Sequence, residues 1–255
     1  MTLTAALVLF AVGLLAGCIN ALAGGSGFLV FPAFIAAGLP PISANASAFI
    51  SLAPANLVGF AVHARFLAEA HHSLPLRAVV AALGGTMGSV LLIAMGANFF
   101  ERAVPWLLLT ATLLFALGPL VKRALERAYA FQGRHFPKLL YAFEFAICLY
   151  GGYFGLGMGI VMLAIYELLG QENFLVANAV KNFVITIVTL IGIVLFASFG
   201  LIAWAPALVM AAGTAVGGYA SMRMAEVVPR SALRAIVLAW AVLLTAYGFW
   251  AYRGG

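Results

Sequence analysis

The segment Ala23-Gly-Gly-Ser-Gly-Phe-Leu-Val-Phe-Pro32 places three glycines, a serine and a proline inside an almost uninterrupted apolar run. In the whole chain of 255 residues, 65% are hydrophobic and only 8% are charged. Soluble domains carry about 25% charged residues, so this chain could not cover a water-exposed surface. The composition predicts an all-α polytopic membrane protein, in which residues that interrupt helices need a specific reason.

Two of the apolar segments are too short to span a bilayer, which takes about 20 helical residues. These are 26–38 and 159–170, and each is followed by a turn and then by a full-length segment. The N-terminal segment 3–22 lacks the basic start of a signal peptide, so we interpret it as a retained helix. The full-length segments are 3–22, 43–62, 77–98, 103–121, 138–158, 174–197, 203–222 and 233–252.

The regions around the two short segments resemble each other, and the matches occur in the same order. They predict two copies of one unit, at 1–121 and 138–255, joined by a charged linker at 122–137. The matches are Gly25-Ser-Gly27 with Gly157-Met-Gly159, Gly38 with Gly170, Ala44-Asn-Ala46 with Ala177-Asn-Ala179, and Gly84/Gly88 with Gly213/Gly217.

The basic residues indicate how the two copies are oriented. Ten of the thirteen Lys and Arg residues lie in the loops 63–77, 122–138 and 222–234. If each short segment forms a hairpin with the segment after it, these loops share one face, and the positive-inside rule makes that face cytoplasmic. Both termini then lie outside. The copies become two inverted repeats of about four membrane helices each, as in many secondary transporters.

The glycine clusters predict where a site lies. In lipid, non-helical backbone is tolerated only where it is buried in protein or lines a cavity. Two breaks at equivalent places, inserted from opposite faces, should meet near the midplane, and helix N-termini there favour an anion. The alternative is that these glycines only permit close helix packing. For Gly84, Gly88, Gly213 and Gly217 we prefer this packing interpretation.

Charged residues inside apolar segments are the second indication of a site. Burying Lys181 costs at least about 2.5–3.5 kcal/mol, so it needs a partner. Three roles fit: an anion ligand, a structural ion pair with Glu144 or Glu167, or a side chain that extends to the interface. Glu144 and Glu167 are candidate coupling carboxylates, and otherwise structural partners. The expected substrate-binding residues are Gly25, Ser26, Gly27, Asn45, Ser47, Gly157, Gly159, Asn178, Lys181 and Asn182.

Other chemistry is not indicated. The sequence holds no nucleophile with a nearby base, no P-loop and no cluster of metal ligands, so we predict no enzyme, no cofactor and no metal site. Cys18 and Cys148 are interpreted as small buried residues. His63, Arg65, Glu69, His71 and His72 are expected to be solvated in a cytoplasmic loop. The basic loops suit a membrane surface rather than nucleic acid.

Together, these motifs resemble a known family over essentially the whole chain. Gly24-Gly-Ser-Gly-Phe-Leu-Val-Phe-Pro32 and Ala44-Asn-Ala-Ser47 resemble the first repeat of the TauE/SafE sulfite exporters. Gly151-Gly-Tyr-Phe-Gly-Leu-Gly-Met-Gly159 and Ala177-Asn-Ala-Val-Lys-Asn182 are similar to the second. The resemblance implies an inner-membrane carrier for sulfite, sulfoacetate or other organosulfonates. In this chain Ser26 stands where many members have glycine.

We therefore expect an inverted-repeat secondary transporter that exports a small sulfur-containing anion by alternating access. Its partners would be the anionic substrate and the lipid bilayer, with a second copy as a candidate homodimer partner. Three alternatives are import of another sulfur compound or organic anion, a passive anion channel, and an intramembrane enzyme. The lack of a paired catalytic set argues against the enzyme.

Overall fold

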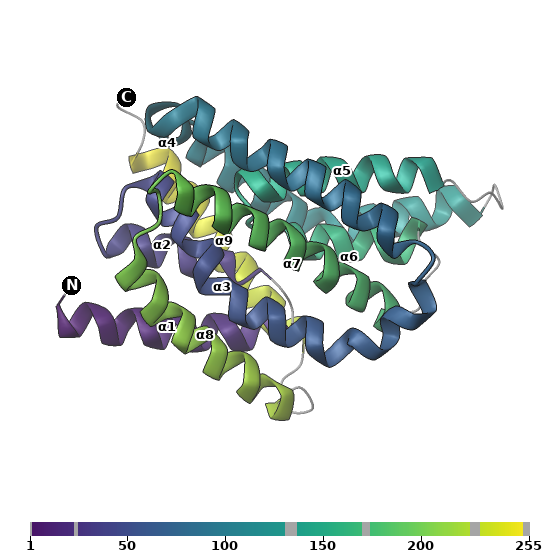
Figure 1. The fold of residues 1–255 in the computed structure, drawn as a ribbon, viewed down its shortest axis with the longest axis horizontal. Coiled ribbons are helices and arrows are strands. Elements are labelled where there is room, and N and C mark those ends of the chain that lie inside the picture. The colour runs from purple at the N-terminus through teal and green to yellow at the C-terminus, as the bar shows by residue number, and fades with distance from the viewer. Residues whose placement is uncertain (1, 23–24, 131–136, 170–173, 225–229, 252–255) are drawn as a thin grey trace.

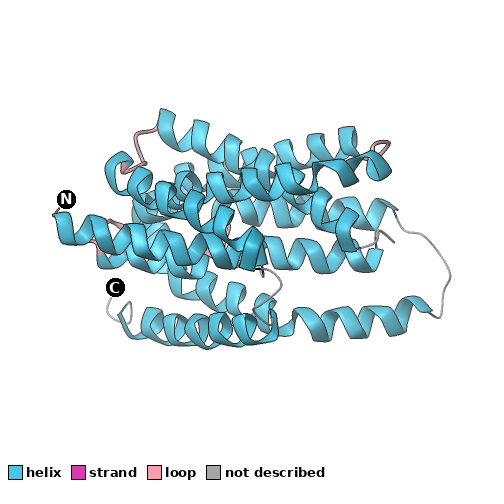
Figure 2. Cartoon of the chain, turned by 90° about the horizontal axis from the view of Figure 1, so that it is seen from below, coloured by secondary structure: helices cyan, strands magenta, loops and turns pink. Residues whose placement is uncertain are grey.

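The computed structural model describes residues 2–22, 25–130, 137–169, 174–224 and 230–251, and these form helices joined by short connections, with no strand among them (Figures 1 and 2). The expected all-helical architecture is confirmed. The elements are α1 (Leu3–Leu22), α2 (Gly27–Ala36), α3 (Pro41–His63), the 3-10 helix η1 (Ala64–Ala70), α4 (Leu74–Ala130), α5 (Pro137–Tyr153), α6 (Met158–Leu169), α7 (Phe174–Ser198), α8 (Trp204–Met224) and α9 (Arg230–Ala251).

Within the described residues, four helical stretches are long and apolar enough to cross a membrane: Leu3–Asn20, Pro41–Ala70, Leu74–Leu114 and Phe174–Ser198. The third covers 41 residues, or about 60 Å of helix, which is twice the thickness of a hydrocarbon core. Gly96 interrupts it with φ 72° and ψ 179°. Helix α4 therefore consists of two arms, 74–95 and 97–130. The second arm contains the predicted segment 103–121, whereas the predicted segment 77–98 extends two residues past the break at Gly96.

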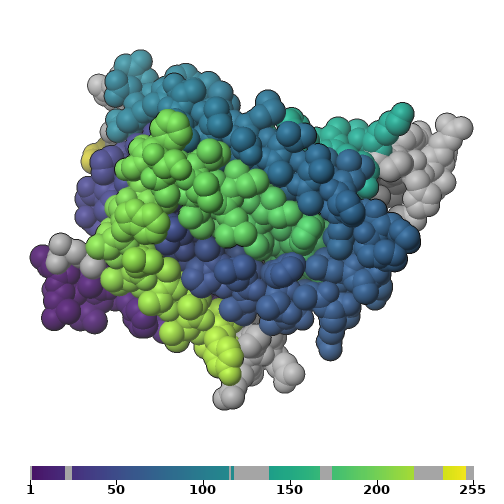
Figure 3. All heavy atoms as spheres, viewed as in Figure 1, coloured from purple at the N-terminus to yellow at the C-terminus, as the bar shows by residue number. Residues whose placement is uncertain are grey.

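The outer surface of the bundle is apolar, as lipid contact requires. Leu3 is 77% exposed, Trp106 is 63% exposed and Trp250 is 72% exposed. Helices from both halves of the chain interleave on one face, where α3 and the first arm of α4 lie beside α7 and α8 (Figure 3). Helix α1 begins, and helix α9 ends, at the left end of the molecule in Figure 1.

The paired Gly-xxx-Gly motifs hold helices in close contact, which confirms the packing interpretation. On α4, a side chain at Gly88 would collide with the carbonyl oxygen of Leu149 on α5. On α8, a side chain at Gly217 would collide with the carbonyl oxygen of Leu14 on α1. Small residues let backbones approach where lipid supplies no hydrophobic force between helices.

Helices α2 and α6 are half-length, and a glycine in the left-handed region precedes each one. Gly25 has φ 81°, while Gly155 and Gly157 have φ 79° and 77°. Positive φ angles of this size strain a residue that has a Cβ atom, whereas glycine adopts them readily. Helix α5 therefore ends at Tyr153, earlier than the predicted segment 138–158, because the chain has already left the helical conformation at Gly155.

Pro32 lies inside α2, where its ring nitrogen cannot donate to the carbonyl of Phe28 one turn earlier. Trp240 on α9 supplies the missing donor. Its indole Nε1–H donates to the Phe28 oxygen at 3.0 Å. The proline of the opening segment is thus accommodated by a neighbouring helix, as expected for broken helices inside membranes.

Candidate functional site

A cavity of about 90 Å³ lies where α2 and α6 begin, and α1, α3, α7 and the end of α5 form its other walls. A space of about 10–15 Å³ is enough to hold one water molecule, so this cavity can hold several waters or a small ion. The predicted residues Gly25, Ser26, Gly27, Gly157, Gly159, Lys181 and Asn182 all line it. The structure thus brings the two glycine breaks and the intramembrane lysine to one place.

The two half-helices begin at the cavity. Several of their first N–H groups already donate to the preceding turn, as Phe28 does to the Gly25 carbonyl at 3.1 Å and Ile160 to the Gly157 carbonyl at 3.1 Å. The helix dipole adds a partial positive charge at this end of each helix. A Cβ atom at Gly27 would lie 3.1 Å from Cγ of Leu156. At Gly159 it would lie 3.2 Å from Cδ1 of Ile185. Glycine at these positions therefore lets the helix starts pack close to Leu156 and Ile185.

Lys181 is the cation of the cavity, and it comes from α7. The alternative in which Lys181 pairs with Glu144 is wrong, because Glu144 pairs with Arg77 instead. Among the side chains that the structure describes, no carboxylate forms an ion pair with Lys181. The side chain of Glu167, the other proposed partner, lies outside the described residues. Within the described side chains, Lys181 thus lines the cavity without a paired carboxylate.

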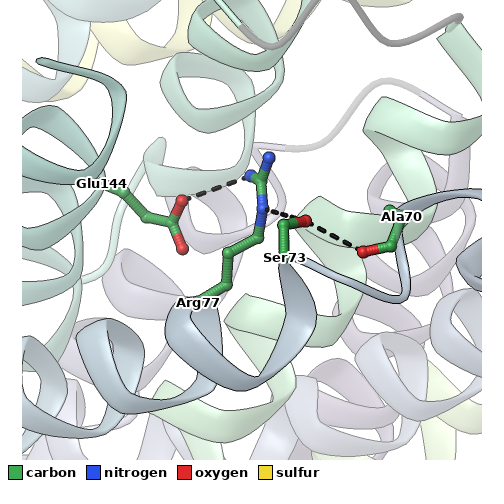
Figure 4. Close-up of polar contacts among 4 residues, drawn as sticks. All are labelled: Ala70, Ser73, Arg77 and Glu144. Atoms are coloured by element: carbon green, nitrogen blue, oxygen red, sulfur yellow. Dashed lines mark hydrogen bonds and ion pairs between the residues drawn. The ribbon is translucent and has the colours of Figure 1, made fainter. Parts of the chain in front are cut away.

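Arg77 and Glu144 form a buried ion pair between α4 and α5, with Nη1 and Oε2 3.3 Å apart (Figure 4). Nε of Arg77 also donates to the hydroxyl of Ser73 at 3.1 Å, and the guanidinium lies 4.6 Å from the ring centre of Tyr166 on α6. The sequence placed Arg77 in the basic loop 63–77, at the start of the apolar segment 77–98, and did not predict its burial. Arg77 is 2% exposed and lies in the first turn of α4, where the carboxylate compensates its charge.

Asn45 and Ser47 are buried outside the cavity lining and connect helices. Nδ2 of Asn45 donates to the Tyr153 carbonyl at 3.1 Å, at the end of α5. The hydroxyl of Ser47 accepts from the backbone N–H of Ala203 at 3.0 Å, just before α8. Both side chains hold α3 against the second half of the chain, and the structure does not bring them to the cavity.

Asn178 also lies outside the cavity lining, and it bonds to His63. Its Nδ2 is 3.0 Å from Nε2 of His63, while Nδ1 of His63 is 2.9 Å from the Gly59 carbonyl. Because a carbonyl only accepts, Nδ1 carries the proton and Nε2 accepts from the amide. His63 was expected to be a solvated loop residue. It instead ends α3 and contacts α7, because the helix extends to this residue.

The sequence analysis missed three polar residues in the cavity: Asn20 on α1, Asn56 on α3 and Thr189 on α7. Each is a polar side chain within an apolar segment, which is itself an indication of function in a membrane protein. They form a chain of hydrogen bonds that begins at Ser26. The hydroxyl of Ser26 donates to Oδ1 of Asn20 at 2.8 Å, Nδ2 of Asn20 donates to Oδ1 of Asn56 at 3.0 Å, and Nδ2 of Asn56 donates to Oγ1 of Thr189 at 3.3 Å.

A multi-pass helical bundle with a polar cavity between two broken helices is the architecture of a membrane transporter. The sequence model for "Sulfite exporter TauE/SafE" matches residues 9–248, and the chain belongs to this family. The predicted family resemblance is confirmed.

Relatives of the chain are also described as membrane transporters. It is 28% identical over 245 residues to a probable membrane transporter protein of Haemophilus influenzae, covering 94% of this chain and 92% of the relative. It is 24% identical over 239 residues to the probable membrane transporter protein YfcA of Escherichia coli, covering 94% and 87%. No solved structure matches. The names of the family and the relatives indicate a membrane transporter rather than an enzyme.

Proposed function

We propose that the protein is a secondary transporter that exports sulfite or an organosulfonate such as sulfoacetate across the cytoplasmic membrane. The observation that carries this proposal is the position of Lys181 in a cavity between the N-termini of two half-helices. Among the described lining residues there is no carboxylate to oppose an anion. Backbone N–H groups, Asn182 and the ammonium group would bind the charged head group.

We further propose that residues 1–121 and 138–255 are inverted repeats about the linker 122–137. The glycine contacts support this proposal, because the contact of Gly88 with Leu149 repeats that of Gly217 with Leu14. Each contact joins a helix of one repeat to a helix of the other. A two-fold axis between the repeats would produce this pair of matching contacts, each between helices of different repeats.

A second pair of contacts supports the same relation at the centre of the molecule. A side chain at Gly59 on α3 would lie 3.2 Å from Asn182 on α7, and one at Gly192 on α7 would collide with Phe49 on α3. In the alignment that equates Asn45 with Asn178, Gly59 corresponds to Gly192, and Phe49 to Asn182. The two helices therefore contact each other through equivalent positions, as they would beside a symmetry axis.

Export is the direction that the membrane potential favours. With the loops 63–77, 122–138 and 222–234 on the cytoplasmic side, an anion leaving the cell moves down an inside-negative potential. The membrane potential contributes about 2.3 kcal/mol of free energy for each charge moved across 100 mV. Export of an anion therefore needs no coupling ion. Two half-helices that close the cavity from opposite sides would supply the gates of alternating access.

Ligand-dependent thermal stabilisation of the purified protein tests the anion site. The ligands are sulfite, sulfate, sulfoacetate, taurine and acetate, and the variants are Lys181→Met and the control Lys138→Met. Lys138 is an exposed lysine on α5. We expect selective stabilisation by sulfite or sulfoacetate that is lost in Lys181→Met and kept in Lys138→Met. Stabilisation that survives the loss of Lys181 would assign that lysine a structural role.

Counterflow in proteoliposomes tests the transport mechanism. Vesicles loaded with the stabilising anion should accumulate labelled anion from outside, and the rate should saturate with concentration. A passive channel would show neither behaviour. An inside-negative potential should accelerate release of the anion, and acceleration of uptake by that potential would contradict the proposed direction.

A further inference from the structure

Helices α3 and α7 pack against each other in opposite directions along the cavity, and their contacts join positions that correspond in the two proposed repeats. Nδ2 of Asn56 donates to Oγ1 of Thr189 at 3.3 Å, and both residues line the cavity. In the alignment that equates Asn45 with Asn178, Asn56 corresponds to Thr189. A contact between corresponding residues lies on the axis that would relate the repeats. This bond therefore marks the middle of the contact between the two helices.

One end of the contact between α3 and α7 is closed by aromatic rings. Phe49 of α3 and Phe196 of α7 pack edge to face, with ring centres 5.0 Å apart and an angle of 85° between the ring planes. Phe49 is 8% exposed and lines the cavity, and Phe196 is fully buried. Phe196 lies in the last turn of α7, so this end faces the outside in the proposed topology.

The other end of the contact has polar residues at the corresponding positions. Asn182 corresponds to Phe49, and it also lines the cavity. His63 corresponds to Phe196, and it is the last residue of α3, on the proposed cytoplasmic side. Nδ2 of Asn182 and Nδ1 of His63 both donate to the carbonyl oxygen of Gly59 at 2.9 Å, and the two nitrogens lie 3.5 Å apart.

The two ends differ in the free energy that opening them requires. Hydrogen bonds between polar groups can be replaced by bonds to water, so breaking them changes the free energy little. Separating two buried aromatic rings exposes apolar surface and loses their edge-to-face interaction. Phe60 and Phe183 also meet at the polar end, with ring centres 6.2 Å apart, but neither of them lines the cavity. The polar end should therefore open more readily than the aromatic end.

We propose that these two pairs of residues form the gates of the cavity beside the half-helices α2 and α6, and that their unequal chemistry keeps the empty cavity facing the cytoplasm. His63 and Asn182 form the inner gate, and Phe49 and Phe196 form the outer gate. An exporter must expose its empty site to the cytoplasm in order to load substrate, and the easily opened inner gate provides this exposure. The inference rests on the proposed transport function and topology, and it names the residues that set the resting direction.

Labelling of a cysteine in the cavity from each side of the membrane tests the gates. In a full-length variant without Cys18 and Cys148, Ala48→Cys places a thiol in the cavity lining. A small impermeant methanethiosulfonate reagent is applied to sealed right-side-out and inside-out membrane vesicles. The measured quantity is the labelling rate from the outside divided by the labelling rate from the cytoplasmic side. In the reporter protein with both gates intact, this ratio should be below one.

Variants at each gate should shift the ratio in opposite directions. Phe196→Leu and Phe196→Ala should both raise it, by about fivefold or more for the alanine variant, because the closed outer gate loses its ring contact. The leucine variant keeps most of the side-chain volume and so limits any loss of folding. His63→Ala should lower the ratio about threefold, because the inner gate loses hydrogen bonds. The controls Val194→Ala and Val62→Ala shorten exposed side chains of α7 and α3 near the gates and should keep the ratio.

Each outcome decides a different point. A ratio that both Phe196 variants leave unchanged would overturn the outer gate, and a ratio that His63→Ala leaves unchanged would overturn the inner gate. A ratio of one or more in the reporter protein would overturn the resting direction. Shifts of opposite sign at both gates would support the gates and invert the proposed topology.

Counterflow of the sulfur anions, measured on the wild-type protein in proteoliposomes, separates this inference from the transport proposal. Counterflow together with unchanged ratios would leave transport standing without these gates. If the folded wild-type protein shows no counterflow, the transport proposal fails, and the role of the gates in export fails with it.

Discussion

Replacing Arg77 with methionine should strongly destabilise the protein, because the change leaves a carboxylate in the interior without its cation. Arg77 is 2% exposed and Glu144 is fully buried, with Nη1 and Oε2 3.3 Å apart (Figure 4). Methionine keeps most of the length of the arginine side chain but cannot donate a hydrogen bond. The change therefore removes the charge and the bonds while leaving little space unfilled.

The expected size of the effect follows from the burial of both groups. Breaking a fully buried ion pair by removing one partner costs about 3–5 kcal/mol. For a chain of this size each kcal/mol shifts Tm by about 2–4 °C, so the shift is on the order of 10 °C. The double variant Arg77→Met/Glu144→Leu should recover much of this loss, because an apolar pair needs no charge compensation.

A native cysteine provides the assay. Cys148 is a free thiol that is completely buried, whereas Cys18 is only partly buried, so a maleimide fluorophore should report unfolding in a variant without Cys18 as it gains access to Cys148. The control is Arg102→Met, which removes an exposed arginine from the same helix. A Tm for Arg77→Met within about 2 °C of the control would refute the reasoning. So would a double variant no more stable than the Arg77 variant.

Three further predictions follow from individual contacts. Gly88→Ala and Gly217→Ala should each lower Tm markedly, because the added methyl groups collide with the carbonyl oxygens of Leu149 and Leu14. A monodisperse variant with the wild-type Tm would contradict this packing. His63→Leu should cost about 1–3 kcal/mol in a detergent unfolding assay, because the amide of Asn178 loses its acceptor, whereas an unchanged Tm would show that the contact is dispensable. In a variant without Cys18 and Cys148, an impermeant maleimide should label Leu3→Cys and Arg102→Cys in intact cells, and Arg65→Cys only in inside-out vesicles; the reverse pattern would invert the proposed topology.

The features that sequence predicted well are those that depend on residues close together in the chain. The short helices α2 and α6 could be predicted because their apolar runs are too short to span a bilayer and glycine clusters precede them. The contacts of Gly88 and Gly217 could be predicted because small residues one turn apart form a flat strip on any helix. These signals need no knowledge of which helix lies opposite.

The features that sequence did not predict depend on how helices rotate against each other. Arg77 stands at the edge of an apolar segment, so a hydropathy pattern assigns it to a loop, whereas its face of α4 turns toward Glu144. Asn20, Asn56 and Thr189 lie on three different helices, and only their packing brings them into one chain of hydrogen bonds. Such partners are set by helix rotation, which a linear pattern does not contain.

The two half-helices α2 and α6 both follow a glycine break, but they contact different kinds of side chain. This difference affects which groups surround the cavity. The carbonyl of Phe28 on α2 accepts from a neutral donor, the indole of Trp240 on α9. Helix α6 instead places Tyr166 against the guanidinium of the buried pair formed by Arg77 and Glu144. The cavity is unequal in the same way, because Lys181 contributes a cation from α7 while Ala48 occupies the corresponding place on α3. Among the described residues that line the cavity, the charge therefore comes from Lys181 on α7, whereas α1, α2 and α3 contribute the neutral side chains of Asn20, Ser26 and Asn56. The two glycine breaks border the cavity, and we expect the side chains that differ between its two sides to determine what it binds.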